Sequence, residues 1–297
     1  MSNNIIITGV TGFVGSNLVK YLFKKGLSIS VIVRESSDLS GLEEYENKIT
    51  FFRYNNNLND LIEFFKEIEP ICVFHLASNF IAEHNSSQID SLVNSNISFG
   101  LHILEAMKEA GVNRLINTGT SWQHFNNEDY NPVCLYAATK QAFEALIEFY
   151  VKAEDFKVIT LKLFDTYGES DTRPKLINLL NKFADEQTEL NMSPGEQMLN
   201  LVHISDVCNA YYIAFNQVLG ILNSVHNTYS ISHKEEYQLK EIIEVFENVT
   251  GKKINVNWGG RPYREREVMD LWVKGINLPN WYAKIGLSEG LSRFKSN

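Results

Sequence analysis

The segment Asn4-Ile5-Ile6-Ile7-Thr8-Gly9-Val10-Thr11-Gly12-Phe13-Val14-Gly15 joins an apolar run to the pattern G-x-x-G-x-x-G. The apolar run predicts a buried strand, and the apolar residues at helical spacing after it predict an amphipathic helix. Glycines at such a junction permit a tight turn and let the backbone approach a pyrophosphate closely. The amides and the dipole at the start of the helix favour a phosphate. The segment therefore predicts a dinucleotide-binding loop, and the alternative is an ordinary turn between a strand and a helix.

Strand-like and helical patterns alternate through the first half of the chain. Strands are expected at 28–33, 49–54, 71–76, 114–118 and 158–163, and helices at 58–68, 87–110 and 136–153. This alternation predicts an α/β fold, a Rossmann-like doubly wound parallel sheet with helices on both faces. After Leu163 the regularity fades, which indicates a smaller, interleaved C-terminal substrate lobe. We expect a nucleotide-binding domain at 1–165, to which 196–218 return, and a substrate lobe formed by 166–195 and 219–297.

The overall composition is that of a soluble globular protein with an acidic balance. The 297 residues carry a formal net charge of −9, which disfavours nucleic acid or an anionic membrane as a partner. Residues 1–4 lead directly into the first expected strand without a leader segment, and no later apolar run reaches the length of a membrane span. We therefore expect a cytoplasmic protein. The 3 scattered cysteines predict reduced thiols, and the 7 histidines show no paired metal spacing, so no metal is expected.

A tyrosine and a lysine lie one helical turn apart in Asn131-Pro132-Val133-Cys134-Leu135-Tyr136-Ala137-Ala138-Thr139-Lys140. This segment can open a helix, so the phenol of Tyr136 and the ammonium of Lys140 would face the same side. A nearby cation lowers the pKa of a phenol, and such a phenol can exchange protons with a carbonyl or an alcohol. Tyr21 and Lys25 have the same spacing in the first expected helix, where a packing role is expected. The spacing alone therefore does not distinguish chemistry from coincidence, and the surrounding motifs decide.

Three further segments carry motifs at the ends of expected elements. They are Phe74-His75-Leu76-Ala77-Ser78, Asn94-Ser95-Asn96-Ile97-Ser98-Phe99-Gly100 and Asn117-Thr118-Gly119-Thr120-Ser121-Trp122. With the glycine loop and the Tyr136/Lys140 pair, they resemble an extended short-chain dehydrogenase/reductase of the nucleotide-sugar epimerase/dehydratase/reductase superfamily over nearly the whole chain. The resemblance implies a nicotinamide dinucleotide as cofactor, a nucleoside-diphosphate sugar as substrate and a homodimer.

The same resemblance assigns the site residues. It makes Tyr136, Lys140 and a hydroxyl at the end of the fifth strand catalytic, and the hydroxyl maps onto Thr118 with Thr120 as the alternative. Hydrogen bonding at a strand end is the other interpretation of these threonines. The expected cofactor-binding residues are Gly9, Thr11, Gly12, Phe13, Val14, Gly15, Arg34, Ser36, Ser37, Asn57, Leu58, Leu76, Ala77, Ser78, Asn96, Thr118, Tyr136 and Lys140.

Departures from the family pattern narrow the choice of cofactor and the choice of reaction. Arg34 follows the second expected strand, where an NAD enzyme usually carries an acidic residue. With Ser36 and Ser37 it favours NADP(H) over NAD(H), and the alternative is a surface arginine. Family dehydratases have an Asp-Glu pair directly after the catalytic threonine, but this chain has Gly119-Thr120, so dehydration is not expected. Asn56-Asn57-Leu58 stands where the family commonly reads G-D-L, which makes Asn57 a candidate adenine contact.

The second half of the chain suggests a sugar nucleotide. Asp165 takes the place of an asparagine that the family often has near the substrate diphosphate. Residues 260–267 contain three arginines, of which Arg264 is the first candidate for the diphosphate because arginine binds phosphate bidentately. A solvated run of charges is the alternative interpretation. The expected substrate-binding residues are Thr120, Asp165, Arg173 and Arg264.

Three short segments indicate a branch of the superfamily. Residues 117–124, 164–168 and 262–267 most resemble the reductases of CDP-4-keto-3,6-dideoxyhexoses, the CDP-abequose and CDP-paratose synthases. We therefore predict NADPH-dependent reduction of the 4-keto group of a nucleoside-diphosphate deoxysugar in surface-polysaccharide sugar biosynthesis. The alternative enzyme is an NAD-dependent 4-epimerase of nucleoside-diphosphate sugars. The alternative of another class is a non-catalytic NADP-binding sensor or scaffold protein.

Overall fold

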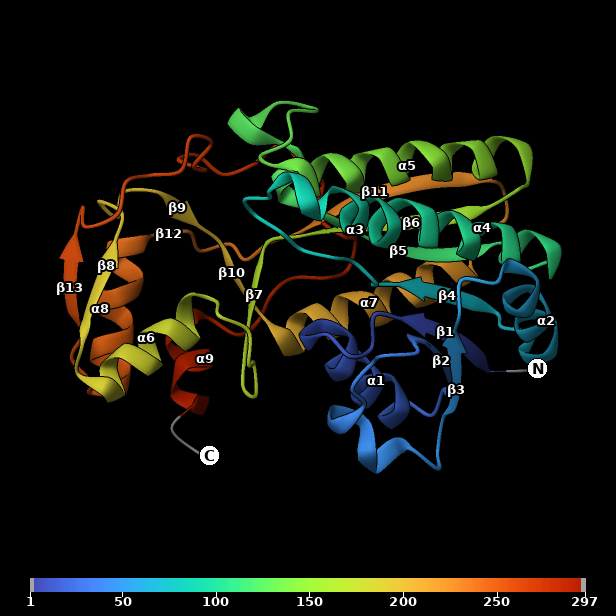
Figure 1. The fold of residues 1–297 in the computed structure, drawn as a ribbon, viewed down its shortest axis with the longest axis horizontal. Helices are drawn as coiled ribbons and strands as arrows, with labels where there is room; N and C mark the ends of the chain where they lie inside the picture. The colour runs from blue at the N-terminus through green and yellow to red at the C-terminus, as the bar shows by residue number, and fades with distance from the viewer. Residues whose placement is uncertain (1–2, 295–297) are drawn as a thin grey trace.

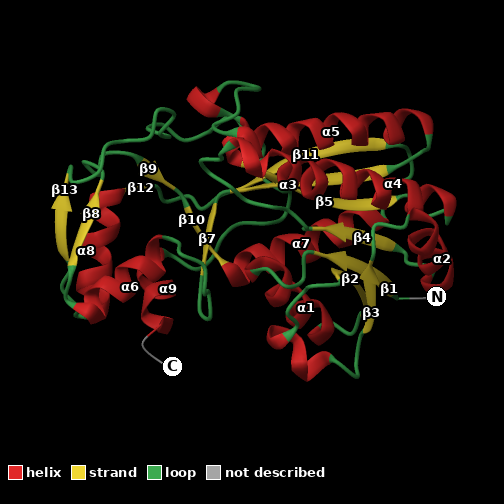
Figure 2. Ribbon diagram, in the orientation of Figure 1, coloured by secondary structure: helices red, strands yellow, loops and turns green. Residues whose placement is uncertain are grey.

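A computed structural model describes residues 3–294, and its centre is a seven-stranded parallel sheet in the order β11-β6-β5-β4-β1-β2-β3 (Figures 1 and 2). Its strands are β1 (Asn4–Thr8), β2 (Ser28–Arg34), β3 (Thr50–Tyr54), β4 (Cys72–His75), β5 (Arg114–Thr120), β6 (Lys157–Leu163) and β11 (Val225–Ile231). The strand order reverses between β1 and β4. In sheets of this kind, ligands bind at the carboxyl ends of the strands beside that reversal.

Helices cover both faces of this sheet. Helices α1 (Phe13–Lys24) and α7 (Ile204–Leu219) lie on one face, at the lower side of Figure 1. Helices α2 (Leu58–Ile68), α4 (Phe99–Glu109) and α5 (Leu135–Ala153) cover the other face. The predicted Rossmann-like doubly wound α/β fold is confirmed.

The first strand shows why the sheet is buried on both faces. Ile5 and Ile7 pack into the core cluster of α1 and α7, whereas Ile6 packs into the cluster of α2, α4 and α5. Successive strand side chains point to opposite faces, so a continuous apolar run serves a strand with helices on both sides. All three isoleucines are 0% exposed, and each such burial contributes roughly 1.5–3 kcal/mol to folding.

The long helix expected at 87–110 is interrupted. The chain forms α3 (Ile89–Val93), then a π-helical turn at Asn94–Ser98, and then α4. Such a turn inserts one extra residue into a helix and often occurs at a functional site. Here it turns Asn96 into the protein interior, where its side chain is 1% exposed.

The smaller lobe lies at the carboxyl end of the sheet, at the left of Figure 1. It contains α6 (Leu176–Glu186), β8 (Glu189–Met192), α8 (Leu239–Thr250), β13 (Asn255–Trp258) and α9 (Leu287–Arg293), which share a core of their own. Two short strand pairs join the lobe to the sheet domain: β7 (Asp165–Tyr167) with β10 (Leu201–His203), and β9 (Met198–Leu199) with β12 (Tyr237–Gln238). The chain crosses between the two parts several times, so the lobe is interleaved with the sheet domain.

The position of β11 differs from the expected division of the chain. The sequence places residues 219–297 in the smaller lobe, but β11 pairs in parallel with β6 as the outer strand of the main sheet. Its sequence mixes Val225 and Tyr229 with polar residues, and only its last two residues are buried. An edge strand of this kind lacks the apolar run that marks a central strand, so periodicity does not reveal it. Residues 1–2 and 295–297, also part of the predicted division, lie outside the described residues.

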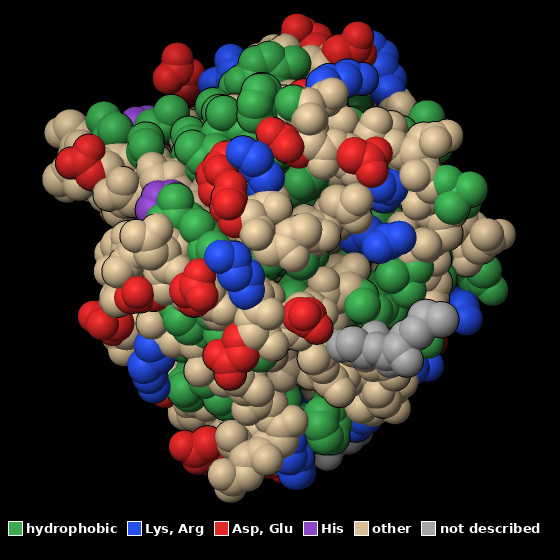
Figure 3. Space-filling view, turned by 90° about the vertical axis from the view of Figure 1, so that its right-hand side faces the viewer, with side chains coloured by type: hydrophobic (Ala, Val, Ile, Leu, Met, Phe, Trp, Pro, Cys, Tyr) green, Lys and Arg blue, Asp and Glu red, His purple; other side chains and the backbone are tan. Residues whose placement is uncertain are grey.

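Within residues 3–294, no helix is both long and apolar enough to cross a membrane. On the face in Figure 3, acidic and basic side chains are interspersed. That face therefore offers no continuous basic stripe to a nucleic acid.

Candidate active site

The glycine loop between β1 and α1 contains two glycines that the fold itself requires. Gly9 has a φ of +74°, and a Cβ there would lie 2.5 Å from the backbone nitrogen of Ala77. A Cβ on Gly15 would lie 2.2 Å from the carbonyl oxygen of Gly9. Gly12 differs, since the nearest atom to a Cβ there is the same oxygen at 3.4 Å, an ordinary contact. The fold leaves room at Gly12, which is the space that a close approach by a pyrophosphate would use.

The start of α1 is suited to an anion. Gly12 is the N-cap residue and gives no side-chain hydrogen bond to the helix, and the first turn contains no acidic residue. The first backbone amides of a helix have no partner within the helix, so here they are available to a ligand. Together with the helix dipole these amides would favour a phosphate, and the loop residues fit a dinucleotide.

Two cavities meet at this loop. A cavity of about 790 Å³ extends over the ends of β2 and β3, and a second of about 260 Å³ extends toward the start of α5. Both are bordered by Gly9, Gly12, Leu76 and Ser78, so they form one cleft along the carboxyl edge of the sheet. Thr11 and Ala77 line the larger part, and Phe13, Val14 and Gly15 line the smaller part.

Arg34 and Ser37 line the outer end of the larger cavity, while Ser36 does not. The Ser37 hydroxyl accepts a hydrogen bond from the Arg34 amide at 3.0 Å, and the Ser37 amide donates to the Arg34 carbonyl at 3.0 Å. These bonds fix the turn that presents Arg34. The sequence did not single out Arg53 on β3, whose Nη1 donates to the Glu35 carbonyl at 2.9 Å. A second guanidinium therefore stands beside this turn, and only the pairing of β2 with β3 reveals it.

Two residues expected to bind the cofactor, Asn57 and Leu58, do not line the cavity. Asn57 caps α2, since its side chain accepts a hydrogen bond from the backbone amide two residues later at 2.9 Å, and Leu58 is the first residue of that helix. Asn56 lines the cavity instead, together with Tyr54 and His102, which hydrogen-bond to each other. Because the side chain of Asn57 caps α2, the preceding residue, Asn56, lines the cavity in its place.

Asn96 supports the cleft wall from the interior. Its Oδ1 accepts hydrogen bonds from the Ser78 hydroxyl at 3.2 Å and the Asn79 amide at 2.7 Å. Its Nδ2 donates to the Asn79 carbonyl at 3.1 Å and to the Thr139 hydroxyl at 2.9 Å. These bonds join the loop after β4 to α5, and they occupy both the oxygen and the nitrogen of the Asn96 side-chain amide. Asn96 thus positions the wall beside the expected cofactor site and does not itself line either cavity.

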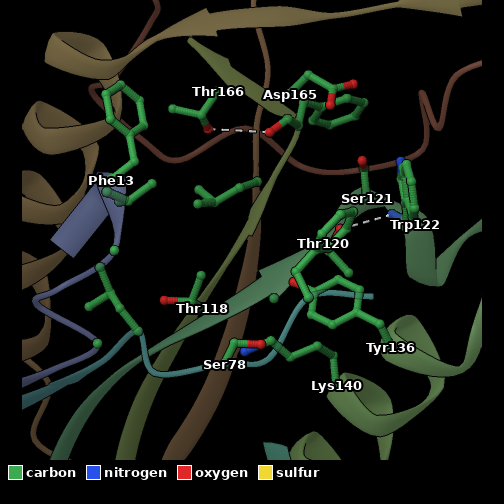
Figure 4. Close-up of a pocket in the computed structure, with 18 of the residues that line it drawn as sticks. Phe13, Ser78, Thr118, Thr120, Ser121, Trp122, Tyr136, Lys140, Asp165 and Thr166 are labelled. Carbon is green, nitrogen blue, oxygen red and sulfur yellow. Dashed lines mark hydrogen bonds between the residues drawn. The ribbon is translucent and has the colours of Figure 1, made fainter. Parts of the chain in front are cut away.

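Tyr136 and Lys140 line the smaller cavity from α5 (Figure 4). Tyr136 is 9% exposed and Lys140 is 2% exposed. Burial raises the pKa of Tyr136 to about 12, and a hydrogen bond with Ser78 acts in the opposite direction. Burial also lowers the pKa of Lys140 to about 8, which the carboxylate of Glu144 opposes. The expected lowering of the tyrosine pKa by the lysine is not found, because burial of the phenol dominates, so Tyr136 holds its proton at neutral pH.

Phe80 forms an aromatic wall that sequence reasoning missed. Its ring meets the ring of Tyr136 edge-on, with centroids 5.0 Å apart, and lies 5.6 Å from the ring of Trp122. The ammonium of Lys175 lies 4.0 Å from the centroid of Phe80. The signal that could have revealed it is an aromatic residue in the loop directly after the fourth-strand motif. Phe80 therefore provides an apolar surface at the mouth of the cavity beside Tyr136, and the Lys175 ammonium lies against this surface.

The two candidate threonines both line this cavity but differ in their hydrogen bonds. The hydroxyl of Thr118 lies 2.7 Å from the buried hydroxyl of Tyr211 on α7. The hydroxyl of Thr120 accepts a bond from the Trp122 amide at 3.3 Å, which leaves its own proton free to donate. The sequence placed Thr118 first, and the structure gives Thr118 a protein partner that the sequence did not indicate. Thr120 can thus donate to a ligand oxygen, while Thr118 shares its hydroxyl with Tyr211.

A third cavity of about 590 Å³ continues from this point into the smaller lobe. It shares several residues with the cavity at Tyr136: Phe80, Ser121, Trp122, Phe164, Asp165, Arg173 and Lys175. Its basic lining residues are Arg173, Lys175, Arg261, Arg264 and Arg266. Five cations around one cavity favour a ligand with several negative charges, such as a diphosphate.

Three of the expected substrate-binding residues, Asp165, Arg173 and Arg264, lie together here. Arg173 is held by Asp171, with two N–O distances of 2.8 Å, and lies 4.5 Å over the ring of Phe13. The guanidinium of Arg264 lies 5.8 Å over the ring of Trp122. Burial raises the pKa of Asp165, while Lys175, Arg173 and Arg264 act against this rise. Asp165 thus stands where the two cavities meet, across from Tyr136 in Figure 4.

Among residues 3–294, no group of three or more histidine, cysteine, aspartate or glutamate side chains is placed to hold a metal ion. Cys72, Cys134 and Cys208 carry free thiols, and Cys72 and Cys208 are buried.

Curated relatives match the chain over nearly its full length. It is 29% identical to the CDP-abequose synthase of Yersinia pseudotuberculosis over 291 residues, which covers 96% of each chain. It is 24% identical to the CDP-abequose synthase of Salmonella muenchen, covering 100% of this chain and 98% of the relative. It is also 27% identical to the UDP-glucuronate 4-epimerase of Thermodesulfobacterium geofontis (strain OPF15), covering 97% of this chain and 94% of the relative.

Solved structures show the same fold. The UDP-glucose 4-epimerase of Brucella ovis in complex with NAD superposes with a TM-score of 0.84 at 17% identity, covering 99% of this chain and 97% of that structure. The UDP-glucose 4-epimerase of Thermus thermophilus in complex with NAD gives a TM-score of 0.80 at 21% identity, covering 97% of this chain and 96% of that structure. At such identities the likeness establishes the fold.

The family follows from a direct match of the sequence. The profile described as NAD dependent epimerase/dehydratase family matches residues 5–227, which includes the glycine loop, Tyr136, Lys140 and both threonines. This match confirms the superfamily predicted from the motifs, and the CDP-abequose synthases among the relatives agree with the predicted branch. The chain belongs to the NAD dependent epimerase/dehydratase family.

Proposed function

We propose that this protein reduces the 4-keto group of a nucleoside-diphosphate deoxysugar with NADPH, and that the substrate is a CDP-4-keto-3,6-dideoxyhexose or a close analogue. The observation that carries the proposal is the series of connected cavities. They run from Arg34, past the buried Tyr136, to a second group of positive charges around Arg264. The similarity to CDP-abequose synthases over nearly the full chain supports the substrate class.

The catalytic roles follow from the ionisation of the two α5 side chains. A bound NADPH would supply the hydride for C4 of the sugar. Tyr136 donates the proton to the C4 oxygen, because burial keeps its pKa near 12 and its proton in place at neutral pH. Lys140, with a pKa lowered to about 8, is still largely an ammonium at neutral pH. Its charge stabilises the anionic oxygen that develops as the proton leaves Tyr136.

We assign the hydroxyl that holds the C4 oxygen to Thr120. The Thr120 proton is free to donate, since the side chain accepts its bond from the Trp122 amide. Thr118 instead lies against Tyr211 and holds the strand end to α7. A donor aimed at a developing oxyanion contributes most when it is fixed before the reaction begins.

The substrate would lie between the α5 pair and the smaller lobe. Arg173, Lys175 and Arg264 would bind its diphosphate, and arginine suits this role because it binds phosphate through two parallel hydrogen bonds. Phe80 and Trp122 provide apolar surface beside Tyr136, which suits a sugar that has lost hydroxyl groups.

The cofactor preference rests on the turn after β2. Arg34 lines the outer cavity, and Arg53 stands beside it on β3 through its bond to the Glu35 carbonyl. A 2′-phosphate can gain charge-assisted hydrogen bonds from such a pair, whereas the free 2′-hydroxyl of NAD usually meets a carboxylate. These contacts favour NADP(H).

An NAD-dependent 4-epimerase of nucleoside-diphosphate sugars is the second candidate. The UDP-glucuronate 4-epimerase among the relatives and the epimerase structures with NAD favour it. Arg34 and the similarity to CDP-abequose synthases favour the reductase instead. A sensor or scaffold without catalysis is disfavoured, because Tyr136, Lys140 and Thr120 line one cavity.

The test is incubation of the purified protein with NADPH and a panel of CDP-, dTDP-, UDP- and GDP-linked 4-ketosugars. We expect oxidation of NADPH with a 4-ketosugar, fastest with a CDP-linked one. Release of tightly bound NAD on denaturation, together with interconversion of C4 epimers, would support the epimerase instead. We also propose that the protein acts as a cytoplasmic homodimer, which sedimentation and cell fractionation would test.

A further inference from the structure

A buried ion pair lies behind the catalytic face of α5. Glu144 follows Tyr136 by two helical turns and is 6% exposed, and Lys162 on β6 is 4% exposed. The Nζ atom of Lys162 lies 3.4 Å from Oε2 of Glu144. Burial of a charged pair is costly unless further hydrogen bonds satisfy both groups. Both members of this pair have such bonds, and they lead toward the candidate active site.

Gln123 connects the carboxylate to the catalytic strand. Its Nε2 donates to Oε1 of Glu144 at 3.0 Å, and its Oε1 accepts from the Thr120 amide at 3.0 Å. Gly119 packs against this group, since a Cβ there would lie 3.0 Å from atoms of Gln123, Glu144 and Lys162. The end of β5 that carries Thr120 is thus held to Glu144 by two successive hydrogen bonds.

His124 extends the network toward the substrate cavity. The Lys162 ammonium donates to Nε2 of His124 at 2.8 Å, and Nδ1 of His124 donates to the Glu128 carbonyl at 3.0 Å. Burial and the charge of Lys162 lower the pKa of His124 to about 4, so the ring is neutral and its Nε2 can accept. The ring stacks on Trp272, with centroids 3.9 Å apart and an angle of 10°. Trp272 lines the basic cavity.

The network also contains an imbalance of charge. Lys140 precedes Glu144 by one turn of α5 and is 2% exposed, so two buried ammonium groups lie near one buried carboxylate. The other titratable groups that face Lys140 are Tyr136 on the same helix and His75 on β4. Both are neutral near pH 7, because burial raises the pKa of Tyr136 to about 12 and lowers that of His75 to about 3. Glu144 therefore supplies the negative charge in this group.

We propose that Glu144 is a positioning residue for the reaction. It holds Thr120 in place through Gln123, balances the charge of Lys140, and through Lys162 and His124 connects both to the Trp272 wall of the substrate cavity. The proposal rests on the proposed function only for the identity of the reaction. The network itself is a property of the protein without ligands.

The first test is Glu144→Gln, which keeps the size of the side chain and removes its charge. We expect turnover of a CDP-4-keto-3,6-dideoxyhexose to fall about 10- to 100-fold, with KM for NADPH within about twofold. The alkaline limb of the pH profile should move to lower pH by about one unit, since loss of a nearby anion favours the neutral lysine. Glu148→Gln is the matched control, because Glu148 lies one turn further along α5 and bonds to His226 at 2.7 Å. Glu148→Gln should change neither the turnover nor the position of the alkaline limb of the pH profile.

A second measurement does not depend on activity. The titration of Lys140 is followed by NMR in full-length protein labelled at the lysine Cε, and Lys140→Met assigns the signal. We expect its midpoint to fall by about one unit or more in Glu144→Gln and to stay in place in Glu148→Gln. An unchanged midpoint overturns the proposal. If the Lys140 midpoint shifts in Glu144→Gln but the wild-type protein reduces none of the ketosugars, the proposal about Glu144 is supported and the proposed function is refuted.

A double variant separates positioning from folding. Glu144→Gln leaves the Lys162 ammonium without its carboxylate, so Glu144→Gln with Lys162→Met removes both charges of the pair. Lys157→Met is the control for the lysine, since Lys157 is also buried on β6 but bonds to Asp155 at the opposite end of the strand. We expect the double variant to be folded and still to show reduced turnover, while its Lys140 midpoint lies closer to the wild-type value because the nearby Lys162 cation is gone as well. Full recovery of turnover would mean that Glu144 serves folding alone and would overturn the proposal.

Discussion

Two tyrosine–lysine pairs with the same spacing lie on opposite faces of one sheet: Tyr136/Lys140 on α5, and Tyr21/Lys25 at the end of α1, where Lys25 is the C-cap residue. Lys25 is exposed, and its ammonium lies over the ring of Tyr21 at 5.4 Å and over that of Tyr212 at 5.1 Å. Lys140 is 2% exposed and lines a cavity with Tyr136. The first pair is therefore a surface packing arrangement, and the second is a buried pair that can meet a ligand.

The position of each pair along its helix explains this difference. Both helices begin at the carboxyl edge of the parallel sheet, where the cavities lie. Tyr136 is the second residue of α5, whereas Tyr21 is the ninth residue of α1, roughly 10 Å further from that edge. Spacing places two side chains on one face of a helix, but distance from the sheet edge determines whether that face meets a ligand.

The largest expected difference between the pairs is in turnover. Tyr136→Phe removes the proton donor while the ring stays packed against Phe80, so turnover of the 4-ketosugar should fall roughly 10²–10⁴-fold with NADPH affinity nearly unchanged. Tyr21→Phe loses only the bond from Asn209 at 3.1 Å and should stay within about twofold of wild type. Steady-state kinetics on both variants checks this. Equal losses would remove the distinction between the pairs.

The lysines should differ next, in the pH dependence of activity. Burial lowers the pKa of Lys140 to about 8, so wild-type activity should decline as pH rises through that value and the ammonium becomes neutral. Tyr136, with a pKa near 12, keeps its proton over the same range. Lys140→Met should lower turnover about 10²–10³-fold and abolish this decline of activity at alkaline pH. Lys25→Met should preserve the decline. A limb that moves with Lys25→Met would contradict the assignment.

A smaller effect should separate the two threonines beside the α5 pair. Thr120→Val removes the donor to the C4 oxygen and should lower turnover about 10- to 150-fold, or about 1.5–3 kcal/mol. Thr118→Val should affect turnover less and mainly reduce stability, because it leaves the buried Tyr211 hydroxyl without its partner at 2.7 Å. Kinetics and urea unfolding of both variants give the two quantities. The reverse order in turnover would return the catalytic role to Thr118.

The smallest expected effect concerns the cofactor that must reach the α5 pair from the far end of the cleft. Arg34→Ala should weaken NADPH binding about 10- to 50-fold, because the arginine is exposed and its ion pair is screened. NADH binding should hardly change. Fluorescence titration with both cofactors measures the preference. Equal binding of NADPH and NADH by wild type would withdraw this support for a reductase.

The sequence predicted the sheet domain well because its signals are local. The apolar run at residues 4–8 and the glycines after it defined β1 and α1, and α2 falls at the predicted residues 58–68. The β11 strand was missed, since an edge strand with mixed polarity resembles a loop in periodicity. The π-helical turn at Asn94–Ser98 was missed as well, because the pattern of residues 87–110 predicts one continuous helix and a single inserted residue is a weak signal in one sequence.

The candidate site was predictable where a residue type and its place in a motif determine its role. Tyr136, Lys140 and the glycines line the cavities as expected. The position of the Asn57 side chain was not predictable from the motif, because it is set by its role as the cap of α2. The bond between Thr118 and Tyr211 joins residues 93 positions apart, so no local pattern contains it. The pKa of Tyr136 could not be foreseen either, since burial depends on the whole fold.

The most direct test of the reductase proposal is the fate of a deuterium label on the cofactor. Wild-type protein is incubated with a CDP-4-keto-3,6-dideoxyhexose and NADPH deuterated on the transferable position of the nicotinamide C4. The proposal predicts one deuterium at C4 of the product sugar and one NADP⁺ formed per sugar. Interconversion of C4 epimers without net NADPH oxidation and without deuterium in the sugar would contradict it.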